Sequence, residues 1–153
     1  MPFKHRQFEN WFNQALNTLK SAQSDLENKF FNWSCFKSQQ AAEYAIKAII
    51  NGLGISITGH TLLRLTDILK NNINDIEFDR KCIIFLDKLY IPTRYADTYD
   101  DGAPFDFYTE DDCKKAIKCV EKIHLIIQTF HDKILEEEKK TAQVDNTNKQ
   151  EEN

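Results

Sequence analysis

Residues 33–53 read WSCFKSQQAAEYAIKAIINGL, and this stretch says the most about the fold. Its apolar side chains recur at steps of three and four residues, which is the spacing of one face of an α-helix. The small side chains of Ala41, Ala45 and Ala48 leave room for another helix to pack closely. Gly54 is well placed to end this helix. The apolar stripe that we expect to face the core consists of Ala42, Ala45, Ile46, Ile49 and Leu53.

Helical spacing continues on both sides of this stretch. It predicts a first helix over about residues 6–28, a modest third helix over about 61–71 and a fourth over about 75–90. A last helix begins at Thr109, because Asp112 follows three residues later in a near capping box. With only 4 Gly and 3 Pro in 153 residues, we predict an all-α fold. The expected architecture is an antiparallel up-and-down four-helix bundle with an additional short helix, about five helices in all.

The last predicted helix repeats apolar residues every seven positions, as the seam of a bundle does. From Glu136 onward the chain has almost no apolar side chains, and residues 141–153 offer no periodicity to bury. We therefore expect one helical domain over residues 1–140, followed by a disordered polar tail over 141–153.

Composition argues against several classes of protein. The formal net charge is −4, which does not favour indiscriminate binding to phosphate backbones. Any nucleotide contact must then come from a local cluster. No stretch approaches the roughly 20 apolar residues of a membrane span, so we expect a cytoplasmic protein that does not associate with membranes.

The cysteines and histidines predict neither a cofactor nor a metal. No two cysteines form a CxxC pair, and each lies in a helical pattern, so we expect buried, reduced thiols. His124 and His131 have no acidic or thiol neighbour at tetrahedral spacing. The four cysteines are Cys35, Cys82, Cys113 and Cys119.

The fourth predicted helix carries more apolar surface than one core contact needs. Two neighbouring stripes would cover nearly half of its circumference at about 100° per residue. A helix of that kind is buried on two sides, so we expect a homodimer that uses this helix. One stripe consists of Ile76, Ile83, Leu86 and Tyr90. The other, which we assign to the dimer interface, consists of Phe78, Cys82, Phe85 and Leu89.

Polar residues border the apolar stripe of the second helix. Gln39, Glu43 and Lys47 follow one another at intervals of four residues, so they can point together into a groove between helices. Alternatively, Glu43 and Lys47 form a routine ion pair on the helix surface. His60, at the start of the third helix, either joins this polar set or only caps the helix and fills a gap.

Residues 91–108 form a long, irregular, aromatic-rich loop, and loops of that length are often functional. Pro92 ends the fourth helix and leaves Arg94 and Tyr95 in the loop. In one interpretation Arg94 binds a phosphate bidentately while a tyrosine ring stacks on a base. In the other interpretation the rings cover the bundle end, and the guanidinium pairs with a nearby acid, namely Asp97, Asp100 or Asp101.

In their order along the chain, these patterns resemble the HEPN domain family (higher eukaryotes and prokaryotes nucleotide-binding). Residues 39–48 are similar to the family's QAAExxxKA stretch, and residues 60–65 to its next motif. Residues 89–97 resemble the segment that contains its loop arginine, and residues 108–116 the entry to its last helix. The resemblance runs from about residue 6 to 135.

The resemblance implies an antiparallel helical bundle that is commonly a homodimer. Prokaryotic members often accompany a minimal nucleotidyltransferase, frequently as a toxin–antitoxin pair. Residue by residue, it implies that a nucleotide would be bound by Gln39, Glu43, Lys47, His60, Arg94 and Tyr95.

The chain departs from the ribonuclease members of the wider family. Those members use an arginine followed, after four to six residues, by a histidine. None of the four arginines here has a histidine in that window, so the usual general acid/base is missing. We therefore favour a non-catalytic nucleotide-binding module, with RNA a less favoured ligand. The alternatives are a ribonuclease toxin and a pure protein-interaction module.

Overall fold

The computed structural model describes residues 2–152, and over that range the chain is helical, with no strand. The α-helices are α1 (His5–Glu27), α2 (Phe31–Gly52), α3 (Leu62–Asn72), α4 (Arg80–Asp87) and α5 (Glu110–Glu151). Two 3-10 turns, η1 (Ala96–Thr98) and η2 (Pro104–Phe107), lie in the loop before α5. The predicted all-α bundle with an additional short helix is confirmed.

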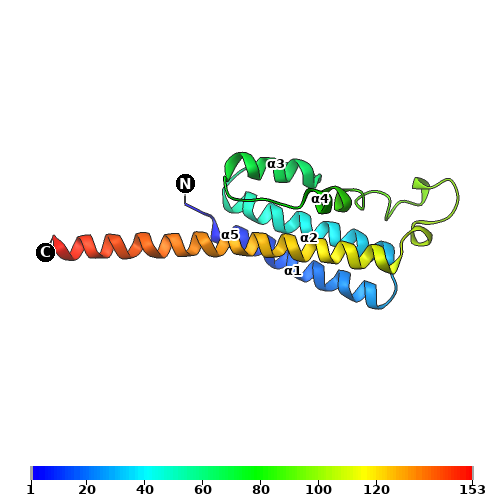
Figure 1. The fold of residues 1–153 in the computed structure, drawn as a ribbon, viewed down its shortest axis with the longest axis horizontal. Coiled ribbons are helices and arrows are strands. Elements are labelled where there is room, and N and C mark those ends of the chain that lie inside the picture. The colour runs from blue at the N-terminus through cyan, green and yellow to red at the C-terminus, as the bar shows by residue number, and fades with distance from the viewer. Residues whose placement is uncertain (1, 153) are drawn as a thin grey trace.

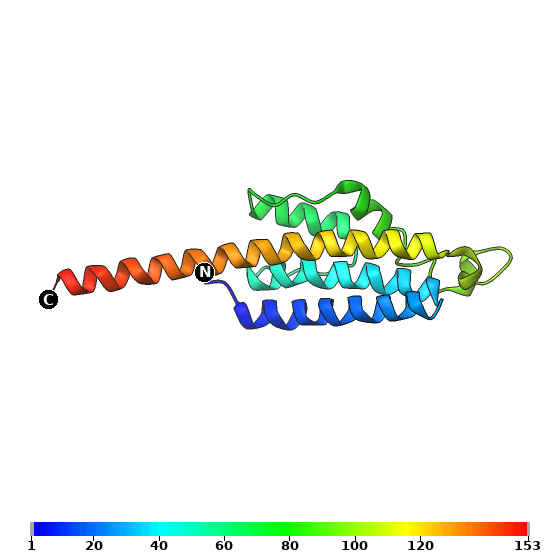
Figure 2. The same ribbon diagram turned by 60° about the horizontal axis from the view of Figure 1, so that its bottom comes forward.

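Helix α2 lies at the centre of the bundle. It runs between α1 and α5, and α3 and α4 cover another side (Figure 1 and Figure 2). The alanines of its predicted stripe are fully buried, as are Ile46 and Ile49, so α1 and α5 can approach it closely. Gly54 has a φ of 75°, which suits the left-handed residue that commonly follows a helix end. None of the described helices is both long and apolar enough to cross a membrane.

The fourth helix is shorter than the sequence predicts, because it covers Arg80–Asp87 rather than about residues 75–90. The side chain of Asp79 accepts a hydrogen bond from the Lys81 backbone N–H at 3.0 Å and caps the helix there. Before this cap, Ile76 and Phe78 are buried while their neighbours are exposed. That alternation is typical of extended chain rather than of a helix.

The prediction of four reduced cysteines is wrong for one pair. Cys82 on α4 and Cys119 on α5 form a disulfide that spans 37 residues of sequence. The other two, Cys35 and Cys113, are free and buried, with their sulfur atoms 3.7 Å apart. The spacing of the cysteines carries no signal for the disulfide, since only the packing of α4 on α5 brings its two thiols together.

Helix α5 continues through residues 141–151, where the sequence predicts a disordered tail. All residues from 135 to 152 are exposed. Glu138 still pairs with His5 at the start of α1, at 2.8 Å, and the last part of α5 extends beyond the bundle (Figure 1 and Figure 2). The folded core therefore buries nothing from this segment. Its independence from the core, which the sequence implies, stays a prediction.

His124 is buried between α5 and α2, and this makes the fold sensitive to acid. Its Nε2–H donates to the Ala41 carbonyl at 2.9 Å, and burial lowers its pKa below the ordinary value of 6.5. Burial, with the neighbouring His5, likewise lowers the pKa of His131. The unfolded chain then binds more protons than the folded chain just below pH 6.5, so the free energy of unfolding falls as pH falls.

We expect the melting temperature to decrease between about pH 6.5 and 5. A His124→Gln variant keeps an N–H donor for Ala41 but cannot take up a proton, so its melting temperature should depend less on pH. Calorimetric scans of both proteins across this range make the comparison. Identical pH profiles would show that His124 does not contribute.

Candidate functional site

A buried carboxylate, Glu43, organises the polar residues of α2. Its side chain is only 2% exposed, and it accepts hydrogen bonds from Gln39 Nε2 at 3.3 Å and from Lys47 Nζ at 3.2 Å. Residues at intervals of four along one helix lie on the same face, and this explains the alignment of the three side chains. The Glu43–Lys47 pair is therefore half-buried in a cluster, and it is more than a solvated surface pair.

His60 completes this cluster from a distant part of the chain. Its Nδ1 lies 3.2 Å from both carboxylate oxygens of Glu43. Because a carboxylate only accepts, Nδ1 carries the proton in this arrangement. The side chain of His60 is 56% exposed, so the ring connects a buried acid to the surface. Of the two interpretations of His60, the structure supports membership of the polar set.

The start of α3 holds His60 in place. The Asp87 carboxylate at the end of α4 accepts hydrogen bonds from the Leu62 and Leu63 backbone N–H groups, at 2.7 and 3.1 Å. It thus caps α3 two residues after His60. Burial raises the pKa of Asp87, and the negative charge of Glu43 adds to the effect.

Tyr90 links His60 to Arg94. The rings of His60 and Tyr90 are stacked, with centroids 5.1 Å apart and 17° between their planes. The guanidinium carbon of Arg94 lies 4.7 Å from the same Tyr90 centroid. Arg94 also donates from Nε and Nη2 to the Tyr90 carbonyl, at 3.0 and 2.8 Å. One aromatic residue thus joins the Glu43 cluster to the loop arginine.

Arg94 is held by rings rather than by acids. Its guanidinium carbon lies 4.1 Å from the Phe36 centroid and 5.0 Å from that of Tyr95. Within residues 2–152, no carboxylate forms an ion pair with it, so the predicted alternative of pairing with Asp97, Asp100 or Asp101 is not what the structure contains. Two of its five N–H groups bond to Tyr90, and three are left for a ligand.

The sequence predicts Lys47 and Arg94 in one site, and the structure connects them only indirectly. Lys47 bonds to Glu43, and its ammonium lies 5.8 Å from the centroid of the Trp11 ring. Within the described chain, no hydrogen bond or ring contact joins it to Arg94. The two cations stand at opposite ends of a chain of contacts that we call the Glu43 strip: Lys47, Glu43, His60, Tyr90, Arg94 and Tyr95.

Three residues that contact this site, Tyr90, Phe36 and Trp11, were not assigned to it from the sequence. The apolar pattern assigns Tyr90 to a stripe of the fourth helix, and it gives Phe36 and Trp11 no part in the site. Phe36 lies about one turn before Gln39 on α2, so helical spacing could have placed it nearby. Tyr90 and Trp11 give no such signal, because their positions depend on how α4 and α1 pack against α2.

The residues predicted for a dimer interface lie mainly in the core of the chain itself. Phe78, Cys82 and Leu89 are buried within one chain, and only Phe85 is half-buried. Since residues 73–79 are not helical, the two apolar stripes never form one broad helical face. Most of the apolar surface that suggested a dimer interface is therefore buried inside the single chain. The interface itself stays a prediction.

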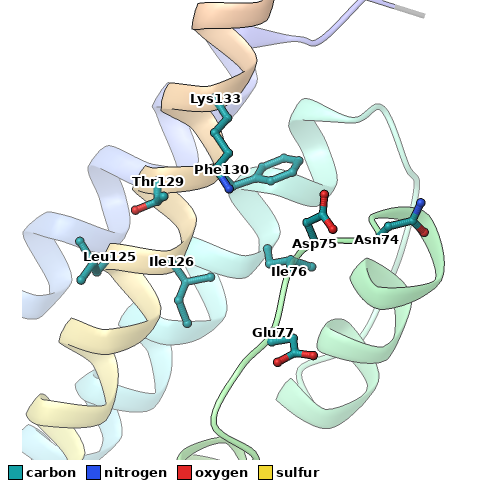
Figure 3. Close-up of a pocket in the computed structure, with 9 residues that line it drawn as sticks. All are labelled: Asn74, Asp75, Ile76, Glu77, Leu125, Ile126, Thr129, Phe130 and Lys133. Atoms are coloured by element: carbon teal, nitrogen blue, oxygen red, sulfur yellow. The ribbon is translucent and has the colours of Figure 1, made fainter.

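An open groove lies away from the Glu43 strip. It has a volume of about 580 Å³ and is formed by residues 74–77 and by α5. Figure 3 shows Ile126 and Phe130 on the side of α5 that faces Ile76, with Lys133 further along. None of the predicted site residues lines this groove.

Comparison with known proteins places this geometry in a family. The profile of the HEPN domain matches residues 8–130. Among solved structures, TT1696 from Thermus thermophilus has a TM-score of 0.73 and 32% identity, over 80% of this chain and 97% of that chain. ST0689, an archaeal HEPN homologue, has a TM-score of 0.63 and 35% identity, over 80% and 95%.

A third structure, an HEPN domain protein from Thermotoga maritima, has a TM-score of 0.61 and 26% identity, over 80% of this chain and 98% of that chain. No functionally curated protein matches this chain. Because the profile spans most of the chain and two similar structures exceed 30% identity, the chain belongs to the HEPN domain family.

Proposed function

We propose that this protein is a non-catalytic nucleotide-binding module and that the Glu43 strip is its binding site. The observation that carries the proposal is the state of Arg94. Its guanidinium lies against aromatic rings, and two of its five N–H groups bond to the Tyr90 carbonyl. Within residues 2–152 no carboxylate forms an ion pair with it. A phosphate is the ligand that such a guanidinium recognises best.

The charges of the strip also favour an anion. Glu43 neutralises one cation through its bond to Lys47, and the charge of Arg94 remains uncompensated. A phosphate near Arg94 and the exposed His60 would supply the missing negative charge. Tyr95 is 46% exposed beside Arg94, so its ring is available to stack on a base. Gln39 and Glu43 would not touch the ligand. Glu43 would fix the orientation of the His60 ring through its hydrogen bond, and Gln39 would hold Glu43 in place.

We further propose that the module acts as a homodimer with a minimal nucleotidyltransferase, in the manner of a toxin–antitoxin pair. This part rests on membership of the family alone. It is tested by mixing the purified protein with such a partner and measuring the mass of the complex by light scattering. If the protein is a dimer but does not bind the nucleotidyltransferase, the result supports the homodimer and contradicts the proposed partner.

Replacing Arg94 with alanine should weaken nucleotide binding by about 1.5–3 kcal/mol, as for a lost charge-assisted hydrogen bond. A panel of nucleotides is first screened by thermal shift, because a ligand that binds only the folded state raises the melting temperature. Calorimetric titration of the best ligand then compares the variant with the unmodified protein.

Arg64→Ala is the matched control for this experiment, since Arg64 is an exposed arginine on α3 outside the strip. It should bind the nucleotide as the unmodified protein does. If no nucleotide raises the melting temperature and Arg94→Ala simply unfolds more readily, Arg94 is a structural brace and the proposal fails.

The enzyme alternative is tested with single-stranded RNA. Because no histidine follows Arg94 at the expected spacing, we expect the RNA to stay intact with excess protein, as judged on denaturing gels. Cleavage that disappears in Arg94→Ala would establish a ribonuclease and overturn the non-catalytic assignment.

A further inference from the structure

One end of the bundle exposes a group of large apolar side chains. The residues come from three segments: the turn between α1 and α2 with the first turn of α2, the chain just after α4, and the loop before α5. The most exposed is Phe105, at 68%. We call this group the aromatic patch, and it consists of Phe30, Trp33, Ile91, Tyr95, Phe105 and Phe107.

The three segments meet at the same end of the molecule. The loop before α5 lies at the end of the bundle opposite the free end of α5, next to the turn between α1 and α2 (Figure 1 and Figure 2). Asn32 Nδ2 donates to the Thr93 carbonyl at 3.0 Å, and this bond fastens the loop to the start of α2. Cys113 Sγ donates to the Phe31 carbonyl at 3.1 Å and fastens the start of α5 there too. These two bonds hold the backbone of the loop and of the start of α5 against the start of α2, so the segments that carry the patch are fixed relative to one another.

The loop that carries much of this patch is strongly acidic. Residues 95–113 contain seven acidic residues and no Lys, Arg or His. Three of these acids are used locally: Asp106 accepts from Ala103 N, Asp112 from Thr109 N, and Glu110 pairs with Lys114. Within residues 95–113, all of which the structure describes, the other four acids are exposed and have neither an ion pair nor a hydrogen bond: Asp97, Asp100, Asp101 and Asp111.

We infer that the aromatic patch docks a basic segment of a partner polypeptide, rich in arginine. The exposed rings and the unpaired carboxylates both attract a guanidinium, because this group pairs with carboxylates and stacks on aromatic faces. Exposed rings beside unpaired acids satisfy these two requirements together. The patch is continuous with the Glu43 strip through Tyr95, but the inference does not depend on nucleotide binding there.

The same charges argue against other occupants. A nucleic-acid strand or an anionic membrane surface that covered the whole patch would meet four unpaired carboxylates and be repelled. The single nucleotide proposed for the Glu43 strip would contact only Tyr95 of this patch. A second copy of this chain also carries a net charge of −4, which opposes docking on an acidic surface. A cationic polypeptide is attracted, and its attraction should decrease as salt is added.

The experiment measures the binding of fluorescently labelled peptides to the full chain by anisotropy at low salt. The probes are an arginine-rich peptide that contains a few leucines and a matched peptide with glutamate in place of arginine. We expect only the arginine-rich peptide to bind. Both Phe105→Ser and the double variant Asp100→Asn/Asp101→Asn should weaken its binding about fivefold.

The chain offers two matched controls. Leu125 is as exposed as Phe105, at 68%, and lies on α5 outside the patch, so Leu125→Ser should bind normally. Asp67→Asn removes an exposed acid from α3 and should also bind normally. All five replaced side chains are exposed, and unchanged melting temperatures would show that the variants remain folded.

Three results would overturn the inference. The first is an arginine-rich peptide that does not bind, or that binds equally well to the patch variants. The second is equal weakening by the controls, which would mean a general charge effect. The third is a patch variant that dissociates a dimer in light scattering or loses binding to single-stranded RNA, because a second copy or a nucleic acid would then be the occupant.

Discussion

Breaking the Cys82–Cys119 disulfide is expected to lower the free energy of unfolding by about 3 kcal/mol. The bond closes a loop across 37 residues of sequence, and a cross-link of that span removes conformational freedom mainly from the unfolded chain. It also attaches the short α4 to α5, and α4 leads directly into Tyr90 and Arg94. Urea titrations of Cys82→Ala/Cys119→Ala against the unmodified protein measure the difference.

Reductant provides the control for this prediction. Adding it should lower the stability of the unmodified protein and leave the double variant unchanged, since the variant has no bond to break. Thiol labelling of the unreduced, denatured protein should find two reactive thiols, those of Cys35 and Cys113. Four labelled thiols in a sample prepared without reductant would contradict the pairing.

Replacing Glu43 with alanine should destabilise the fold by about 3 kcal/mol or more. The carboxylate is 2% exposed and its partner Lys47 only 14% exposed. Its removal leaves an ammonium in a half-buried position without its counter-charge, and breaking a buried pair on one side is strongly destabilising. His60 and Gln39 lose an acceptor as well. Thermal and urea unfolding both measure the effect.

Glu110→Ala is a matched control, because Glu110 and Lys114 form an ion pair of the same sequence spacing at 3.1 Å, with both side chains 60% exposed. Exposed pairs of this kind contribute under about 1 kcal/mol. The contrast between the two variants isolates the effect of burial. If both variants lost the same small amount of unfolding free energy, Glu43 would not be the acceptor that holds the Glu43 strip together.

Amphipathic spacing is a local property, and most of the correct predictions from the sequence rest on it. Apolar steps of three and four residues located α1, α2 and α3 to within about two residues. The same spacing aligned Gln39, Glu43 and Lys47 on one face of α2. Thr109 and Asp112 form the predicted capping box at the start of α5.

Periodicity failed where local chemistry competed with it. The apolar spacing of residues 75–90 fits a helix. In the structure, however, Asp79 caps a helix that begins only at Arg80, and the residues before it alternate between buried and exposed, as in extended chain. The broad face predicted for a dimer therefore does not exist as one surface. Phe78, Cys82 and Leu89 are buried in the core of their own chain instead.

The amino-acid sequence alone was enough to predict the set of helices, the buried face of α2 and the polar residues that border it. The bond between His60 and Glu43, the position of Tyr90 against both His60 and Arg94, and the disulfide between Cys82 and Cys119 emerge only from the folded chain. Helical periodicity fixes which side of a helix is apolar, and it can be read from neighbouring residues. Contacts between residues far apart in the chain depend on how whole helices pack, and no local pattern encodes that packing.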